Sequence, residues 1–312
     1  DVDTAADVTI MEEGTELLHR LKEGGPLPLI TSCSPGWIKF CEHYFPEMTE
    51  NLSTCKSPQQ MFGATYKTYY AEKMGLDPKK ILFVSAIPCT AKKFEVGRPD
   101  QSAAGVPDVD VAITTRELAR MIQKAGIDFR GMADEKFDVP FDIGSGAGAI
   151  FGATGGVMEA ALRTAADVLE NRSVENVEYH EVRGLTGIKE ATFTLGGKEL
   201  KVAVANSTGA AKELIQRIKA GDASYAFVEV MACPGGCVNG GGQPIVSAYK
   251  RMDVDPRAAR AAGLYAEDES KILRKSHENP DIQKLYAEFL GEPNGHLAHK
   301  LLHTEYIDRS DD

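Results

Sequence analysis

The chain has 312 residues, of which 43% are hydrophobic and 26% charged, and these values are typical of a soluble globular protein with one large domain or two lobes. Its formal net charge of −11 argues against nucleic acid or an anionic membrane surface as a partner, because both require basic patches. No apolar run is long enough for membrane insertion, no signal peptide is visible, and the opening Asp1-Val-Asp3 without an initiator Met indicates a cut or processed end.

The first half of the chain is predicted to alternate helices and strands. Residues 8–22 predict a helix on which Glu13, Glu16 and Arg20 share one face, and a charged face of this kind is most often solvated. The elements that follow are a strand at 27–31, a helix at 59–75, buried strands at 80–87 and 109–115, and a helix at 116–125 capped by Thr115. This alternation predicts a parallel, doubly wound sheet that binds ligands beyond the carboxyl ends of its strands.

The second half is predicted to have a similar design. An irregular stretch at 126–144 leads to a glycine-rich segment at 144–156, which fits a loop lying close to a cofactor as well as it fits a nucleotide-binding loop. The predicted elements are a helix at 157–170, strands at 177–182, 190–195 and 200–205 with a Gly196-Gly197 hairpin turn, a helix at 208–220 and a strand at 225–231.

We therefore expect an α/β protein of two lobes, each with a mainly parallel doubly wound sheet, and a cofactor in the cleft between them. The expected divisions are a first lobe at 1–140, a second lobe at 141–250 and a helical C-terminal segment at 251–312 that packs on the lobes.

The six cysteines are too sparse for a disulfide scaffold, and four of them follow apolar runs in contexts marked by glycine or proline. These four are Cys33, Cys89, Cys233 and Cys237, whereas Cys41 and Cys55 are interpreted as ordinary thiols. Four thiols match the ligand count of a 4Fe–4S cluster, and the glycines after Cys237 would let the backbone approach it closely. Zinc is the rival, but structural zinc usually takes two local cysteine pairs and only one pair is local here.

Three segments of the chain carry a resemblance to a known family. They are Thr31-Ser-Cys-Ser-Pro-Gly-Trp37, Pro88-Cys-Thr-Ala-Lys-Lys-Phe-Glu95 and Glu229-Val-Met-Ala-Cys-Pro-Gly-Gly-Cys-Val-Asn-Gly-Gly-Gly-Gln-Pro244. Together they resemble the catalytic domain of the iron-only (FeFe) hydrogenases. The resemblance extends over essentially the whole chain, including the glycine-rich segment and Lys275-Ser-His-Glu-Asn279.

The resemblance implies an H-cluster, which is a 4Fe–4S cubane joined through a cysteine sulfur to a two-iron subsite with CO, cyanide and a bridging dithiolate. By position, Cys89, Cys233 and Cys237 would hold the cubane, and Cys237 would bridge to the two irons. Lys92 would donate to a cyanide, since an anionic ligand in a dry cavity needs a charged donor. The residues implied to line the pocket are Met231, Ser57, Pro58, Gln59, Ile87 and Phe151.

The resemblance also implies a route for protons. Cys33 would shuttle protons to the cofactor, and Glu13, Glu16, Ser53 and Arg20 would carry them to solvent. This implication reverses the expectation that the charged face of helix 8–22 is merely solvated.

Two positions depart from the family pattern. Ser34 stands where the family has a second cysteine that binds the cubane, so either Ser34 binds iron as an alkoxide, or Cys33 becomes the ligand, or the cubane is incompletely held. Serine holds its proton more tightly than cysteine, so alkoxide ligation should be weaker and should lower the cluster potential. Ile87 stands where relatives often carry Met.

The implied function is the reversible reduction of protons to H2 by a ferredoxin- or cytochrome-linked oxidoreductase. The family's ferredoxin-like domains, and the start of its catalytic domain, are not in this chain, so electrons would arrive from an iron–sulfur domain or subunit beyond it. The expected location is the cytoplasm, with the periplasm as the alternative. The alternative function is that of an iron–sulfur assembly or sensory relative with the same fold; intact Lys92 and Cys33 argue against it.

Overall fold

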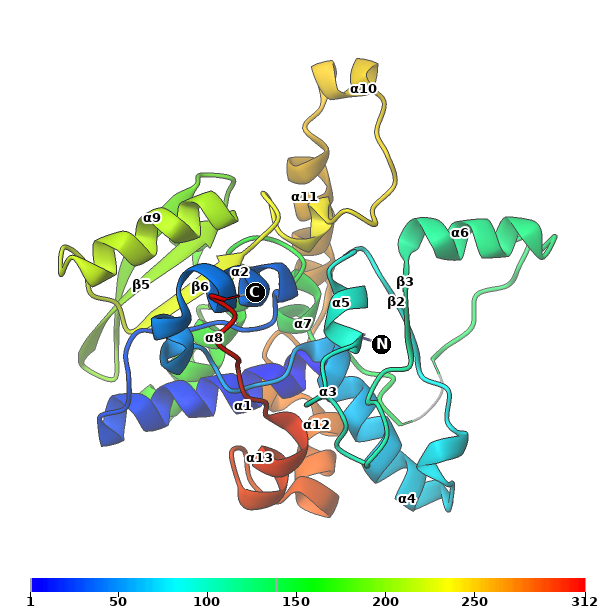
Figure 1. The fold of residues 1–312 in the computed structure, drawn as a ribbon, viewed down its shortest axis with the longest axis horizontal. Helices are drawn as coiled ribbons and strands as arrows, with labels where there is room; N and C mark the ends of the chain where they lie inside the picture. Colours follow the sequence, from blue (N-terminus) through cyan, green and yellow to red (C-terminus); the bar gives the residue numbers. More distant parts are fainter. Residues whose placement is uncertain (1, 138–139, 312) are drawn as a thin grey trace.

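The computed structural model describes residues 2–137 and 140–311, so Asp1, Asp312 and part of the expected irregular stretch at 126–144 lie outside the described residues. The fold is α/β with two sheets (Figure 1). In spatial order, the larger sheet contains β1 (Leu29–Ile30), β6 (Phe227–Met231), β5 (Lys198–Asn206) and β4 (Ile188–Leu195), and the smaller sheet contains β2 (Val84–Ile87) and β3 (Val111–Thr114). All neighbours are parallel except β4 and β5, which confirms the mainly parallel character expected from the sequence.

The larger sheet is covered on both faces because the side chains of its central strands alternate between two apolar clusters. Phe227 and Met231 of β6 pack into a cluster with helix α8 (Gly156–Glu170), whereas Val228 and Val230 pack into another with α9 (Thr208–Lys219). The hairpin between β4 and β5 turns at Gly196 and Gly197, which both have positive φ, as the sequence predicts.

Helix α1 (Val2–Glu23) is longer than the predicted helix at 8–22 and runs through the interior. It packs against α3 (Pro58–Thr65), α7 (Gly146–Ile150) and α8. Glu12 and Glu13 are fully buried, and Glu16 is 9% exposed. The composition-based expectation of a solvated face is therefore wrong, and the helix carries its carboxylates inward.

The remaining helices before the glycine-rich segment are short. They are α2 (Pro35–Tyr44), α4 (Ala71–Met74), α5 (Lys92–Val96) and α6 (Thr115–Lys124), with a π-helical turn at Tyr66–Tyr70 that joins α3 to α4 along the predicted helix at 59–75. The cap of α6 is Thr114, one residue before the predicted Thr115, because the spacing Thr114 to Glu117 completes a capping box.

Three predictions for individual strands are wrong. Strand β1 pairs with β6, so residues 27–125 do not form one sheet. The strands at 80–87 and 109–115 are not buried on both faces, because alternate side chains such as Val84 and Val111 are 46% and 42% exposed. The predicted strand at 177–182 is replaced by a 3-10 turn at His180–Val182. The lobe boundary at 140 stays a prediction, and β1 crosses it by pairing with β6.

The C-terminal segment wraps around the rest of the protein after α10 (Ala248–Asp253), which projects at the top of Figure 1. Its other helices are α11 (Pro256–Ser270), α12 (Pro280–Leu285) and α13 (His296–Leu302), with a π-helical turn at Tyr286–Leu290. A fully buried ion pair between Arg163 of α8 and Asp268 of α11, at 2.8 Å, ties this segment to α8, which packs on the larger sheet. No helix in the described part of the chain is both long and apolar enough to cross a membrane.

Candidate active site

One cavity of about 320 Å³ lies where the carboxyl ends of β1, β2 and β6 face one another. Its walls include Ser34 and all four cysteines that the sequence singles out, namely Cys33, Cys89, Cys233 and Cys237. These residues come from three segments that are far apart in the sequence. The geometry therefore brings the thiols at three strand ends to one place.

Strand pairing sets two of these segments side by side. The amide of Thr31 donates to the carbonyl of Val228 at 2.9 Å, and the amide of Ala232 donates to the hydroxyl oxygen of Ser34 at 3.3 Å. The third segment joins through its backbone, where the amide of Gly242 donates to the carbonyl of Pro88 at 2.8 Å.

The glycines after Cys237 make this close backbone contact possible, because they have no side chain. A Cβ atom on Gly240 would lie 2.3 Å from the carbonyl oxygen of Pro88, and one on Gly242 would lie 2.8 Å from the side chain of Thr114. Gly240 also lines the cavity, but the close approach that excludes a side chain there is to the Cys89 loop. The glycines thus bring two cysteine-bearing loops together.

The thiols on the cavity wall influence one another electrostatically. Burial, followed by the neighbouring Cys89, raises the pKa of Cys237 to about 12. The same two causes raise the pKa of Cys233 above its ordinary value. These thiols are therefore neutral in the protein alone and would release protons on binding a metal. Three thiols that interact with one another on the wall of one cavity fit an iron–sulfur cluster.

Lys92 provides a buried cation at the cavity. Its ammonium donates to the backbone carbonyl of Cys33 at 3.0 Å and to the two carboxylate oxygens of Glu95 at 3.0 and 3.1 Å. Sequence reasoning did not single out Glu95, although its position three residues after Lys92 on a helix could have suggested the pair. Glu95 also accepts from Ser57 and Gln59, so a small polar network holds the lysine in place.

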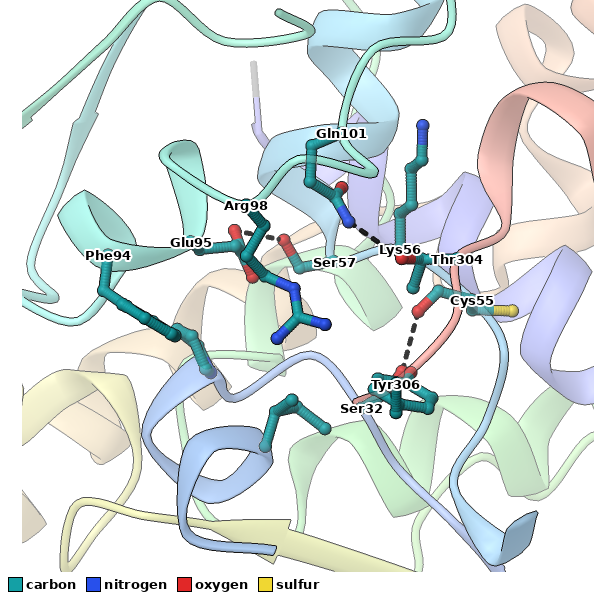
Figure 2. A pocket seen from close by; sticks show the side chains of 12 residues that line it. Ser32, Cys55, Lys56, Ser57, Phe94, Glu95, Arg98, Gln101, Thr304 and Tyr306 are labelled. Atoms are coloured by element: carbon teal, nitrogen blue, oxygen red, sulfur yellow. Dashed lines mark hydrogen bonds between the residues drawn. The ribbon is translucent and has the colours of Figure 1, made fainter. Parts of the chain in front are cut away.

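Most of the expected pocket residues line the cavity. They are Met231, Pro58, Gln59, Ile87 and Phe151. Ser57 is not among the wall residues; its hydroxyl donates to Glu95 at 2.8 Å and faces a second cavity of about 20 Å³, room for roughly one water molecule. Figure 2 shows this small cavity, with Ser57 and Glu95 on one side and Tyr306 on the other.

The residues expected to carry protons form a series that leads away from Cys33. Glu13 is fully buried, and within the described part of the chain neither of its carboxylate oxygens has a hydrogen-bond partner of standard geometry. Burial, and next the nearby Glu16, raise the pKa of Glu13 to about 8, although Ser53 and the amide of Ser32 lie near enough to oppose the rise. Burial and Glu13 likewise raise the pKa of the Cys33 thiol.

The outer end of this series is connected by hydrogen bonds. The hydroxyl of Ser53 donates to Glu16 Oε2 at 2.9 Å, and Arg20 Nη2 donates to Glu16 Oε1 at 2.6 Å. Arg20 is partly exposed and also donates to the carbonyl of Leu52 at 2.9 Å. The five residues thus extend from the cavity to the surface.

Four further buried groups lie beside this series and were given no role from the sequence. Glu12 accepts from the hydroxyl of Tyr286 and from His303 Nε2, the latter at 3.0 Å. The thiol of Cys55 lies 3.9 Å from Glu16 Oε2. No sequence signal could link residue 12 to residue 303, because the contact arises from the wrapping of the C-terminal segment.

Comparisons with known proteins identify the family of the chain. Residues 1–241 match the family model described as the C-terminal domain of the iron only hydrogenase large subunit, and residues 253–309 match that of the iron hydrogenase small subunit. The fold and the family match place the chain in the iron-only hydrogenase class of proteins. More particularly, the chain belongs to the iron-only (FeFe) hydrogenase family, whose characteristic cofactor is the H-cluster.

The similar proteins include the NADP-reducing hydrogenase subunit HndD of Solidesulfovibrio fructosivorans, with 51% identity over 99% of this chain and 53% of the relative. Iron hydrogenase 1 of Clostridium pasteurianum is 50% identical over 98% of this chain and 53% of its own length. The chain therefore spans about half the length of these curated relatives. A solved variant of the [FeFe]-hydrogenase HydA1 from Chlamydomonas reinhardtii superposes with a TM-score of 0.85 at 44% identity, covering 99% of this chain and 84% of that one.

Proposed function

We propose that the protein catalyses the reversible reduction of protons to H2 at an H-cluster held in the 320 Å³ cavity. The observation that carries this proposal is the meeting of Cys33, Cys89, Cys233, Cys237 and Lys92 around one cavity. Relatives named as hydrogenases, at 50% and 51% identity, support it. Because the chain spans about half of their length, the activity of the whole protein remains a proposal.

In this proposal, different cavity residues hold different parts of the cofactor. Cys89, Cys233 and Cys237 would hold the cubane, and Cys237 would also lie next to the two-iron subsite. Lys92 donates to an anionic cyanide, and Glu95 holds the ammonium in position. When bound, the H-cluster would supply irons that store electrons and a basic group that exchanges protons. Lining residues such as Phe151 and Met231 keep water away from it.

The fourth ligand of the cubane is expected to form the weakest bond to iron in the site. Ser34 lies on the cavity wall and accepts a hydrogen bond from Ala232, so its oxygen is held by the same strand pairing that positions Cys233. We propose that Ser34 occupies the fourth position, with Cys33 as the competing ligand. An alkoxide requires the loss of a more tightly held proton than a thiolate does, so this bond should be the first to break.

Protons are proposed to move between Cys33 and solvent through Glu13, Ser53, Glu16 and Arg20. A proton carrier works best when its pKa lies near the working pH, and burial brings the pKa of Glu13 to about 8. The Ser53 hydroxyl can pass a proton because it both donates and accepts. The Arg20 ion pair would orient Glu16 at the surface end of the series.

Electrons are proposed to come from ferredoxin-type clusters in a domain or subunit outside these residues, with a ferredoxin or a cytochrome as the ultimate donor. The remaining thiols, Cys41 and Cys55, lie in two separate groups of apolar side chains. The chain therefore offers cysteine ligands for a single iron–sulfur cofactor. We propose a cytoplasmic location, with the periplasm as the alternative, and fractionation of the source cells separates the two.

Infrared spectroscopy of the purified protein tests the cofactor. We expect bands of iron-bound CO and cyanide together with H2 evolution from a reduced electron donor. An iron–sulfur assembly relative would give a cubane without those bands, and a sensory relative would give the bands with little turnover. Either result would contradict the proposed catalytic function.

Two variants test the proton series. We expect Cys33→Ala and Glu13→Gln each to lower turnover by about 10²-fold or more while the infrared bands persist, because general acid–base groups contribute on this scale. Glu23→Gln, an exposed change on the same helix, is the matched control and should keep normal turnover. Loss of iron from Cys33→Ala would instead identify Cys33 as a cubane ligand, and normal turnover in both variants would refute the series.

A further inference from the structure

A cluster of three buried side chains lies beside the proton series. Glu16 of α1, Cys55, and His303 after α13 each offer a metal-binding atom, and these atoms lie within 4.8 Å of one another. Cys55 is 1% exposed, His303 7% and Glu16 9%. We propose that these three side chains form a binding site for a divalent cation of the Zn²⁺ class, separate from the cofactor cavity.

The distances suit such an ion. Zinc bonds to oxygen at about 2.1 Å and to sulfur at about 2.3 Å, so at a tetrahedral angle the two ligand atoms stand about 3.6 Å apart. Glu16 Oε2 and Cys55 Sγ are 3.9 Å apart, which requires a movement of a few tenths of an ångström. The backbones of Cys55 and His303 are joined by an antiparallel bridge, so these two ligands are already fixed relative to each other.

The mixture of ligands selects the kind of cation. Carboxylate oxygen, imidazole nitrogen and thiolate sulfur together are typical of zinc sites. Magnesium and calcium take oxygen ligands and would gain nothing from Cys55 and His303. The fourth position would be filled by water or by Glu12, whose Oε2 lies 3.0 Å from His303 Nε2.

His303 is also supported in the way that metal-binding histidines usually are. Its Nδ1 lies 2.7 Å from the hydroxyl of Thr54, and its Nε2 faces Glu12. Whichever nitrogen binds the ion, the other keeps a hydrogen bond that orients the ring. Glu12 is itself held by the amide of Asn294 at 2.8 Å.

The charge around the cluster favours a cation. Glu12, Glu13 and Glu16 face it from α1, whereas the facing cations are Arg20, bound to Glu16 Oε1, and His303 when protonated. The neutral groups around them are Tyr286, Ser53 and Thr54, and His299 stacks on His303. Oε2 of Glu16, on the side of Cys55, is free of the arginine in this arrangement.

Burial and the nearby Glu16 raise the pKa of the Cys55 thiol. Binding of the ion would expel the thiol proton, so affinity should increase with pH. Figure 2 shows that the sulfur of Cys55 points away from the small cavity, on whose side its carbonyl accepts from Ser32. The thiol is therefore directed to the Glu16 side.

A second group of possible metal ligands, Asp167, His277 and Glu278, is less suited to bind a cation. The ammonium of Lys275 lies 2.7 Å from Asp167 Oδ2 and takes the place that a cation would need. That group has no sulfur ligand, and two of its members, His277 and Glu278, are partly or fully exposed.

An ion bound at Glu16 would have a consequence for turnover. The metal would occupy the carboxylate oxygen that accepts from Ser53 and would prevent Glu16 from carrying protons. This inhibition rests on the proposed function, because it requires that protons pass through Glu16. Binding itself does not rest on it.

The test uses the cofactor-loaded protein, in which Cys89, Cys233 and Cys237 are already engaged. After incubation with Zn²⁺ and desalting, bound zinc and retained iron are measured by elemental analysis for the wild type and for Cys55→Ala and His303→Gln. We expect one zinc more per chain in the wild type than in either variant. The matched control is Cys41→Ala, which removes a buried thiol from a different apolar cluster and should retain the zinc.

Cobalt provides a second readout, because a Co²⁺–thiolate bond gives a charge-transfer absorption that Cys55→Ala should lose. Zinc should slow H2 evolution at least tenfold in the wild type, relative to its own zinc-free rate, and leave Cys55→Ala at its zinc-free rate. Equal zinc content in wild type and Cys55→Ala would overturn the site. Zinc bound through Cys55 without any slowing would leave the site in place and refute the proton role of Glu16.

Discussion

The ammonium of Lys92 donates a 3.0 Å hydrogen bond to the backbone carbonyl of Cys33, 59 residues earlier in the chain. This contact joins the segment after β1 to the segment after β2, which belong to different sheets. Glu95 holds the ammonium from the other side, and Lys92 is 5% exposed. The cation is therefore fixed at the cavity wall before any cofactor arrives.

Replacing Lys92 with Met should prevent stable capture of the two-iron subsite while leaving the cubane in place. The cause is the loss of a charged donor to an anionic cyanide in a dry cavity. Infrared bands of CO and cyanide should be absent, and iron content should correspond to the cubane alone. Lys93→Met, which removes an exposed ion pair with Glu117, should keep the bands. Full activity in Lys92→Met would show that the assigned role is wrong.

Glu13 should make the stability of the protein depend on pH. Its pKa rises from 4.5 to about 8 on folding, so the folded state binds an extra proton between these values. The free energy of unfolding should therefore fall as pH rises from about 4.5 to about 8, by on the order of a few kcal/mol, and then level off. Glu13→Gln should remove this part of the dependence. Denaturant titrations of both proteins at pH 5 and pH 8.5 measure it, and parallel changes in the two would contradict it.

Ser34→Cys should strengthen the hold on the cubane. A cysteine gives up its proton more easily than a serine and is the usual ligand of the cluster, so more iron should remain after gel filtration. The reduction potential of the cubane should rise as well. Ser34→Ala distinguishes the alternatives, because it should lose iron if Ser34 is the fourth ligand. Unchanged iron in both variants would mean that Ser34 does not bind the cubane.

Arg163→Ala should destabilise the protein by about 3 kcal/mol, because it removes one of the two arginine partners from each of two buried carboxylates, which keep only Arg183 and Arg274. Arg163 is fully buried and pairs with Glu159 at 2.9 Å and with Asp268 at 2.8 Å. Arg172→Ala is the matched control, since that side chain is 65% exposed and its removal should change stability by about 0.5 kcal/mol or less. Thermal or denaturant unfolding measures both, and equal stability would show that the buried network is dispensable.

The cofactor cavity could be predicted well from the sequence because its ligands sit in long, specific segments. Cys89, Cys233 and Cys237 each follow an apolar strand, and the rule that ligands gather at the carboxyl ends of parallel strands places them together. The helix of Glu13 and Glu16 was also predictable from its pattern. Its burial was not, since a charged face carries no local sign of what will cover it.

What the sequence could not supply are contacts between distant segments. The apolar run at 80–87 predicts a strand buried on both faces, yet Leu82 is 72% exposed, because hydrophobicity does not say whether a covering layer is present. The pairing of β1 with β6 and the approach of His303 to Glu12 are likewise tertiary. Glu95 is the exception, because its spacing from Lys92 was visible in the sequence.

Strand β1 has two residues, yet its alignment with β6 decides the chemistry of the adjacent positions 33 and 34. Leu29 is paired with Phe227 and Ile30 with Val228, and Thr31 adds a side-chain bond to the amide of Val230. Successive side chains along an extended segment point to opposite sides. A shift of the register by one residue would reverse the directions of the Cys33 thiol and the Ser34 hydroxyl. Cys33, which is suited to proton transfer, would then lie beside Ala232 in place of Ser34. The roles of Cys33 and Ser34 thus depend on the register of β1 against β6 as much as on the two side chains themselves.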